Sequence, residues 1–145
     1  SPDVPFKLMR ALIDDKDYAG IHPTMHSDHP FLKPDNSGKI KTVGFIEFTA
    51  PMFRSAAFDK FKLDENVWYY YFDLILCDLL SSIGQSVVVH HGCEIGHTYL
   101  RNGVKHRITL IREQLRDLTL PAQKQYMRDN FGLDWEQKLR FQHYA

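Results

Sequence analysis

Two carboxylates and a pair of histidines stand out between Tyr69 and Gly92, in the segment YYYFDLILCDLLSSIGQSVVVHHG. Asp73 and Asp78 are the only charged residues in a stretch whose apolar spacing predicts a helix that ends at Gly84. A buried ionised carboxylate costs several kcal/mol unless it is paired or has a task. A positioned carboxylate can act as a general base, so Asp73 is the first candidate for chemistry. The alternative is that Asp73 lies on a solvated stripe of the helix with Asp78.

The histidines form a second candidate group. His90 and His91 end a predicted strand, Val87 to His91, and alternation places them on opposite faces, so only one of them can face a site. Together with Cys93 and His97 they suggest a zinc site, but this spacing matches no common zinc-binding pattern. A structural histidine is the simpler interpretation. The upstream histidines and their acidic neighbour fall in a polar loop: His22, His26, Asp28 and His29.

The elements that must position these residues can be predicted from periodicity and from Pro and Gly signals. In the first part of the chain we expect a helix from Pro5 to Ile13 capped by Asp3, a strand from Tyr18 to Pro23, a loop from His22 to Lys41, and a strand from Thr42 to Phe48 that Ala50 to Phe53 extends. A short helix from Ser55 to Phe61, a helix from Asn66 to Gly84, the strand from Val87 to His91 and a loop from Gly92 to Gly103 should follow. The rest should be helical, from Val104 to Leu118, Ala122 to Asn130 and Asp134 to Tyr144, with Pro121 breaking the first of these three helices. This order predicts an α/β fold with few strands.

Length and composition narrow the class of protein. A chain of 145 residues forms one domain or part of one. A net charge of zero argues against nucleic acid as a partner. Two cysteines cannot build a disulfide framework, so we expect a reducing compartment. The chain opens on polar residues without a signal peptide, and no apolar run is long enough to span a bilayer, so we expect a cytoplasmic protein.

Three segments together resemble a known family. FDLILCDLLSSIG, followed by VVVHHG, resembles the acidic helix, glycine and His-His-Gly strand of family-two glycosyltransferases with the GT-A fold, and rhamnosyltransferase-like members in particular. TVGFIEFTAPMFRSAAFDKFKLDE is similar to the segment that precedes this helix, in its register of a small residue, Ala, a hydrophobic residue and Arg. SPDV resembles the end of the Asp-x-Asp motif. The resemblance covers residues 1–100.

The departures from the family pattern shape what the resemblance implies. Position 1 is Ser where the motif has its first acidic residue, Phe72 and Ile75 stand where the family often has acids, and the nucleotide-binding βαβαβ half is missing. The resemblance therefore implies a partial GT-A-like α/β fold, with a few-stranded mixed sheet flanked by helices and with C-terminal helices. Residues 1–100 would be the acceptor-side half, and residues 101–145 a C-terminal helical extension.

The resemblance also implies an activity and a set of site residues. The chain would transfer a sugar from a UDP- or dTDP-linked donor to a glycan or lipid-linked acceptor. Asp73 would be the general base, and Asp3 and His90 would bind Mn²⁺ or Mg²⁺, which suit hard oxygen ligands. Substrate would be contacted by Thr49, Ala50, Trp68, Phe72 and His91.

Other partners and functions remain open at this point. Residues 101–128 hold seven cations against two acids, Glu113 and Asp117, with Asp129 directly after them, a pattern typical of a helix resting on the inner face of a membrane, or of a solvated helix face. The main alternative function is a non-catalytic module, derived from a GT-A half-domain, that binds carbohydrate or protein. A metal-dependent hydrolase or nuclease using the histidine-rich segments is the third, and the spacing of the histidines argues against it.

Overall fold

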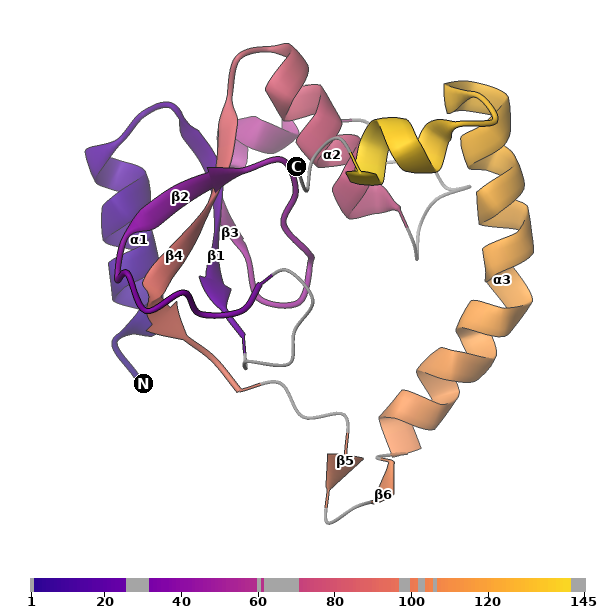
Figure 1. Cartoon of the computed structure of the whole chain (residues 1–145), viewed down its shortest axis with the longest axis horizontal. Helices are drawn as coiled ribbons and strands as arrows, with labels where there is room; N and C mark the ends of the chain where they lie inside the picture. Colours follow the sequence, from indigo (N-terminus) through magenta and orange to yellow (C-terminus); the bar gives the residue numbers. More distant parts are fainter. Residues whose placement is uncertain are drawn as a thin grey trace.

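A four-stranded mixed sheet with helices on both faces forms the body of the protein (Figure 1). The computed structural model describes residues 2–25, 32–59, 61, 71–96, 100–101, 104–105 and 107–141. The strands lie in the order β2-β4-β1-β3 and span Tyr18–Thr24 (β1), Ile40–Val43 (β2), Met52–Phe53 (β3) and Ser86–Glu94 (β4). The central strands β1 and β4 are parallel, whereas β2 and β3 run antiparallel at the two edges. The predicted α/β class, with few strands and flanking helices, is confirmed.

Helices α1 (Val4–Asp14) and α2 (Phe72–Ser82) cover opposite faces of this sheet. Side chains alternate along a strand, so β4 presents Val88 to α1, and Val87 and Val89 to α2. The α1 face is completed by Val4, Leu8, Ala11, Leu12 and Ile21, and the α2 face by Ala19, Phe45, Ile46, Leu74, Leu76, Cys77 and Leu80. The sheet therefore separates two apolar layers.

The two helices lie at different places along the sheet. α1 ends at Asp14 just before β1, and α2 ends at Ser82 just before β4. The first turn of α1 lies near the carboxyl end of β4, whereas α2 lies on the other side of the sheet, and its last turn is near the start of β4 (Figure 1).

Arg54, which follows β3, ties the opposite end of α1 to the sheet. Its Nε donates to the carbonyl of Tyr18 over 2.8 Å. Its Nη2 donates to the carbonyl of Asp15 over 2.9 Å and also to the carbonyl of Leu12. The guanidinium thus satisfies carbonyls that the last turn of a helix leaves without a partner.

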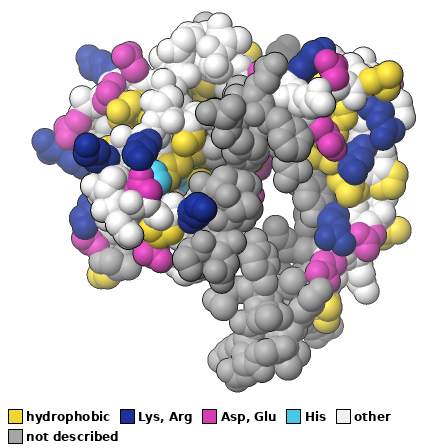
Figure 2. Space-filling model, viewed as in Figure 1, with side chains coloured by type: hydrophobic (Ala, Val, Ile, Leu, Met, Phe, Trp, Pro, Cys, Tyr) yellow, Lys and Arg dark blue, Asp and Glu magenta, His cyan; other side chains and the backbone are white. Residues whose placement is uncertain are grey.

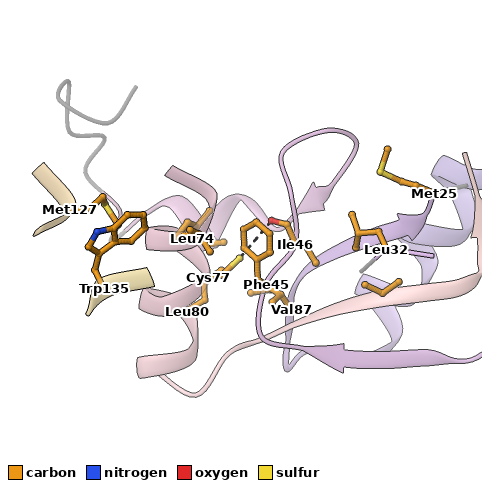
Figure 3. Packing of buried hydrophobic residues seen from close by; sticks show 14 residues of the cluster. Met25, Leu32, Phe45, Ile46, Leu74, Cys77, Leu80, Val87, Met127 and Trp135 are labelled. Atoms are coloured by element: carbon orange, nitrogen blue, oxygen red, sulfur yellow. Dashed lines mark hydrogen bonds between the residues drawn. The ribbon is translucent and has the colours of Figure 1, made fainter. Parts of the chain in front are cut away.

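The C-terminal region packs against α2, although the elements that lead to it extend away from the main sheet. A two-stranded sheet of β5 (Leu100–Arg101) and β6 (Val104–Lys105) leads into α3 (Arg107–Phe131), and a π-helix, η3 (Glu136–Phe141), follows. The first half of α3 stands away from the main sheet (Figure 1). Met127 and Trp135 come back to pack beside Leu74 and Leu80 of α2 (Figure 3).

Several element boundaries differ from the sequence-based expectation. The strand expected from Tyr18 to Pro23 overlapped the loop expected from His22, and the structure extends β1 through both residues to Thr24, with a bulge between Pro23 and Thr24. The strand expected up to Phe48 stops at Val43, and Met52–Phe53 pairs with β1 as a separate edge strand. Ser55–Phe58 is a 3-10 helix, η1, shorter than the expected helix.

The helices also depart from expectation. Pro121 does not break the helix, since α3 runs through it as one element from Arg107 to Phe131 and merges two expected helices. An internal proline removes one hydrogen bond and costs about 3 kcal/mol, which the remaining bonds of a 25-residue helix offset. The described part of α2 begins at Phe72, and the expected cap Asn66 lies outside the described residues.

Candidate functional site

Asp73 lies in the first turn of α2. Its Oδ1 accepts the backbone N–H of Leu74 over 3.0 Å, and the carboxylate also accepts the N–H of Phe48. Burial raises the pKa of Asp73 to about 6, and the nearby negative charge of Glu47 adds to the rise, whereas the two backbone hydrogen bonds oppose it. Asp73 is therefore not on a solvated stripe but in a partly desolvated position.

The residue before this helix adopts an unusual backbone conformation. Tyr71 has a φ of 67°, in the left-handed region, which costs a non-glycine residue about 1–2 kcal/mol. Its ring packs edge-on against Trp135 with 4.7 Å between the centroids, and this contact holds the turn in place. The helix therefore begins at Phe72, and the side chain of Asp73 lies beside the amides of its first turn. Strained turns of this kind often accompany functional sites.

The segment from Glu47 to Ala50 runs beside Asp73. The Phe48 ring packs edge-on against Phe72, with centroids 4.7 Å apart, and stacks on Phe53 at 5.2 Å. Thr49 and Ala50 follow directly, and both bond to the ring of His22. The structure thus brings together four residues that the sequence predicted for one site: Thr49, Ala50, Phe72 and Asp73. The fifth, Trp68, lies outside the described residues.

The sequence did not predict the roles of two residues of this site, Glu47 and His22. Glu47 read as part of a strand, yet it is the only charge in GFIEFTAPMF, and that isolation was the available signal. His22 read as a loop residue, yet it is fully buried in β1. Its contact with Thr49 joins residues 27 positions apart, so local sequence patterns give no sign of it.

Asp3 and His90 lie together on the other face of the sheet, near the start of α1. Asp3 forms an ion pair with Lys7 at 2.8 Å, and its side chain makes no capping hydrogen bond. Burial, followed by the charge of Lys7, lowers the pKa of His90. His91 points to the opposite face, as strand alternation predicted. Asp3 and His90 are therefore not on the face that carries Asp73.

The donor atoms around Asp3 and His90 do not fit a metal ion. The Nδ1 of His90 accepts the N–H of Gly92 over 3.1 Å, so the neutral ring carries its proton on Nε2 and offers no lone pair there. The carboxylate of Asp3 is engaged by Lys7. Within the part of the chain that the structure describes, no group of three or more His, Cys, Asp or Glu side chains is arranged to hold a metal. The Mn²⁺ or Mg²⁺ ion stays a sequence-based prediction.

His91 contacts the edge strand β2 and the loop before it. Its Nδ1 lies 3.1 Å from Oδ1 of Asp35, which also pairs with Lys41. Lys41 and the amide of Ser37 hold the pKa of Asp35 well below its usual range. Burial lowers the pKa of His91 despite the neighbouring carboxylate. Through Asp35, His91 therefore connects β4 to Lys41 of β2. Its expected role in substrate binding stays a prediction.

Comparisons with known proteins do not identify a relative of this chain. No family model, no curated protein and no solved structure matches it. In the described residues, no helix is long and apolar enough to cross a membrane. The function is therefore argued from the site itself.

Proposed function

We propose that this chain is the acceptor-side half of a nucleotide-sugar-dependent glycosyltransferase in which Asp73 is the general base. The single observation that carries the proposal is the Asp73 carboxylate, with a pKa raised to about 6, in the first turn of α2 beside Glu47 and Phe48. A general base works best when its pKa is close to the operating pH, because it must be ionised yet hold a proton well. The sequence resemblance supplies the reaction class.

In this proposal the residues around Asp73 prepare the acceptor. At neutral pH the carboxylate is ionised and takes the proton of an acceptor hydroxyl. That oxygen attacks the anomeric carbon, the carbon–oxygen bond to the diphosphate breaks, and the nucleoside diphosphate leaves with the bonding electron pair. Phe48 and Phe72, packed edge-on, provide an apolar surface beside the carboxylate, and the small residues Thr49 and Ala50 would let a sugar ring approach closely. The donor would bind mainly in the half that the resemblance implies and this sequence lacks.

The proposal extends to the surface that would meet a lipid-linked acceptor. The first half of α3 exposes Ile111, Leu115 and Leu118, one helical turn apart, together with Leu110. Cations on the same helix include Arg116, Lys124 and Arg128. Figure 2 shows apolar and charged side chains interspersed along α3. An apolar stripe with cations beside it suits peripheral binding to an anionic membrane, which would bring the site close to its acceptor.

The test is a transfer assay with the intact gene product and a panel of UDP- and dTDP-sugars. We expect Asp73→Asn to lower turnover by at least ~10²-fold while donor binding changes little, because the base acts on the acceptor. Wild-type turnover should rise as the pH rises through about 6, where Asp73 ionises, and the variant should lack this rise. Asp78→Asn, the same change on the same helix, is the matched control. Near-normal turnover in Asp73→Asn would instead favour a non-catalytic binding module.

A further inference from the structure

His22 is a fully buried histidine whose hydrogen bonds define its protonation state. Its Nε2 accepts the backbone N–H of Ala50 over 3.3 Å, so this nitrogen carries no proton. The hydroxyl of Thr49 then donates to the same Nε2 over 2.9 Å, and Sδ of Met25, 3.8 Å away, is a second, weaker acceptor of the same proton. The Nδ1 carries the proton and donates it to the carbonyl of Pro23. The ring is therefore neutral, in one tautomer, with both nitrogens engaged.

These bonds connect β1 to the segment that contacts Asp73. The segment Glu47 to Ala50 has no ladder partner, since β2 ends at Val43 and β3 begins at Met52. His22 holds its second half through Thr49 and Ala50, and the N–H of Phe48 donates to Asp73 from its first half. Thr49 and Ala50, which bond to His22, follow Phe48 by one and two positions in the sequence. A change at His22 should therefore also displace the N–H of Phe48.

We propose that His22 is a positioning residue for Asp73, acting through the segment Glu47 to Ala50. Its role follows from geometry, because β1 is a central, buried strand and provides a rigid support for a segment that lies between strands β2 and β3. The importance of this positioning for catalysis rests on the proposed function, since it assumes that Asp73 is the base. The positioning itself does not need any transfer activity, and so it can be tested separately.

The experiment is NMR on the chain of residues 1–145 with three variants. His22→Leu removes the acceptor, His22→Gln keeps an acceptor oxygen, and Thr24→Val is the matched control. Thr24 is also fully buried in β1 and hydrogen-bonded, but its hydroxyl donates to the carbonyl of Cys93, away from the segment. The ¹⁵N spectrum of the wild-type imidazole should show a proton on Nδ1 and none on Nε2.

The decisive measurements are the titration of the Asp73 carboxyl and amide hydrogen exchange. In His22→Leu the loss of the Phe48 bond should raise the Asp73 midpoint by at least ~0.5 pH unit, because that bond favours the ionised form. Exchange at Phe48 and Ala50 should accelerate at least ~10-fold relative to the amides of α2. His22→Gln should move both values back toward wild type, and Thr24→Val should change neither.

Each outcome decides the proposal. An unchanged Asp73 titration in His22→Leu, or an equal change in Thr24→Val, would show that His22 is only a core residue. If His22→Leu does not fold, Thr49→Val replaces it, since it removes one of the two donors to Nε2, and it should shift the Asp73 midpoint upward by a smaller amount. An unchanged midpoint in Thr49→Val would then overturn the proposal. A transfer-active Asp73→Asn would end the proposed function but leave the NMR result standing, so the two failures are distinguishable.

Discussion

Asp73 is a residue whose environment opposes its charge. Burial raises its pKa to about 6 from 3.8, although backbone N–H groups, including those of Leu74 and Phe48, stabilise the ionised form. In the unfolded chain the carboxyl ionises near its ordinary pKa. Between about pH 4 and pH 6 the folded state therefore holds a proton that the unfolded state has lost, and stability falls as the pH rises. A group retained at such a cost is expected where function requires it.

This argument predicts that Asp73→Asn stabilises the protein at high pH. The rise of the pKa of Asp73 from 3.8 to about 6 corresponds to a loss of at most ~3 kcal/mol in the free energy of unfolding. We expect Asp73→Asn to recover ~1–2 kcal/mol of it at pH 8. The gain should shrink as the pH falls from 6 to 4, where folded wild type is protonated. Urea denaturation across this pH range measures it.

Asp134→Asn provides a control of opposite sign. Lys138 lowers the pKa of Asp134, so this carboxylate stabilises the folded state above its ordinary pKa, and the variant should lose stability there rather than gain it. A variant Asp73→Asn that is less stable than wild type at pH 8 would contradict the desolvated environment described for Asp73.

Among the elements, α3 carries an exposed apolar stripe. Leu118 is 78% exposed on the half of α3 that stands away from the sheet, and Ile111 and Leu115 precede it on the same helix face. Leu133 is 90% exposed but lies beyond the end of α3, outside the stripe. Comparing substitutions at Leu118 and at Leu133 therefore distinguishes an effect of the stripe from a general effect of exposed apolar side chains.

We predict that the chain binds vesicles of anionic lipid through this stripe. Burying a leucine in the membrane interface is worth about 1.5–3 kcal/mol, so Leu118→Glu should lower the partition coefficient at least ~10-fold. Leu133→Glu should lower it much less. Co-sedimentation with anionic and zwitterionic vesicles measures the effect. An absence of wild-type binding to anionic vesicles, or equal losses in the two variants, would leave α3 as a solvated helix.

The elements also show which parts of the fold local patterns can predict. The helix at Val4–Asp14 and the end of α2 at Gly84, whose φ is 76°, follow from signals within a few residues. The edge strand β3 does not, because two residues form a strand only where β1 offers a partner. Helix α3 passes through Pro121 for a similar reason, since length and the packing of Met127 override one local signal.

At the scale of the whole molecule, the sheet divides the predicted site residues. Alternation in β4 predicts that His90 and His91 face opposite sides, and their charged neighbours differ, Lys7 of α1 for His90 and Asp35 before β2 for His91. It did not predict which helix covers which side, because this depends on packing between segments distant in sequence. The structure places Asp3 and His90 with α1, and Asp73, Phe72 and the Thr49–Ala50 segment with α2.

This division leads to a prediction about the donor. The donor would need a metal ion to bind its diphosphate, yet Asp3 pairs with Lys7 and His90 presents a protonated Nε2. We expect residues 1–145 to bind UDP- and dTDP-sugars in the presence of Mn²⁺ with a Kd weaker than ~1 mM, as measured by calorimetry. His90→Ala and His91→Ala should leave this weak binding unchanged. Micromolar, Mn²⁺-dependent binding that His90→Ala abolishes would contradict this expectation. Such a result would mean that Asp3 and His90 rearrange around the ion and that the α1 face, rather than the α2 face alone, contributes to the donor site.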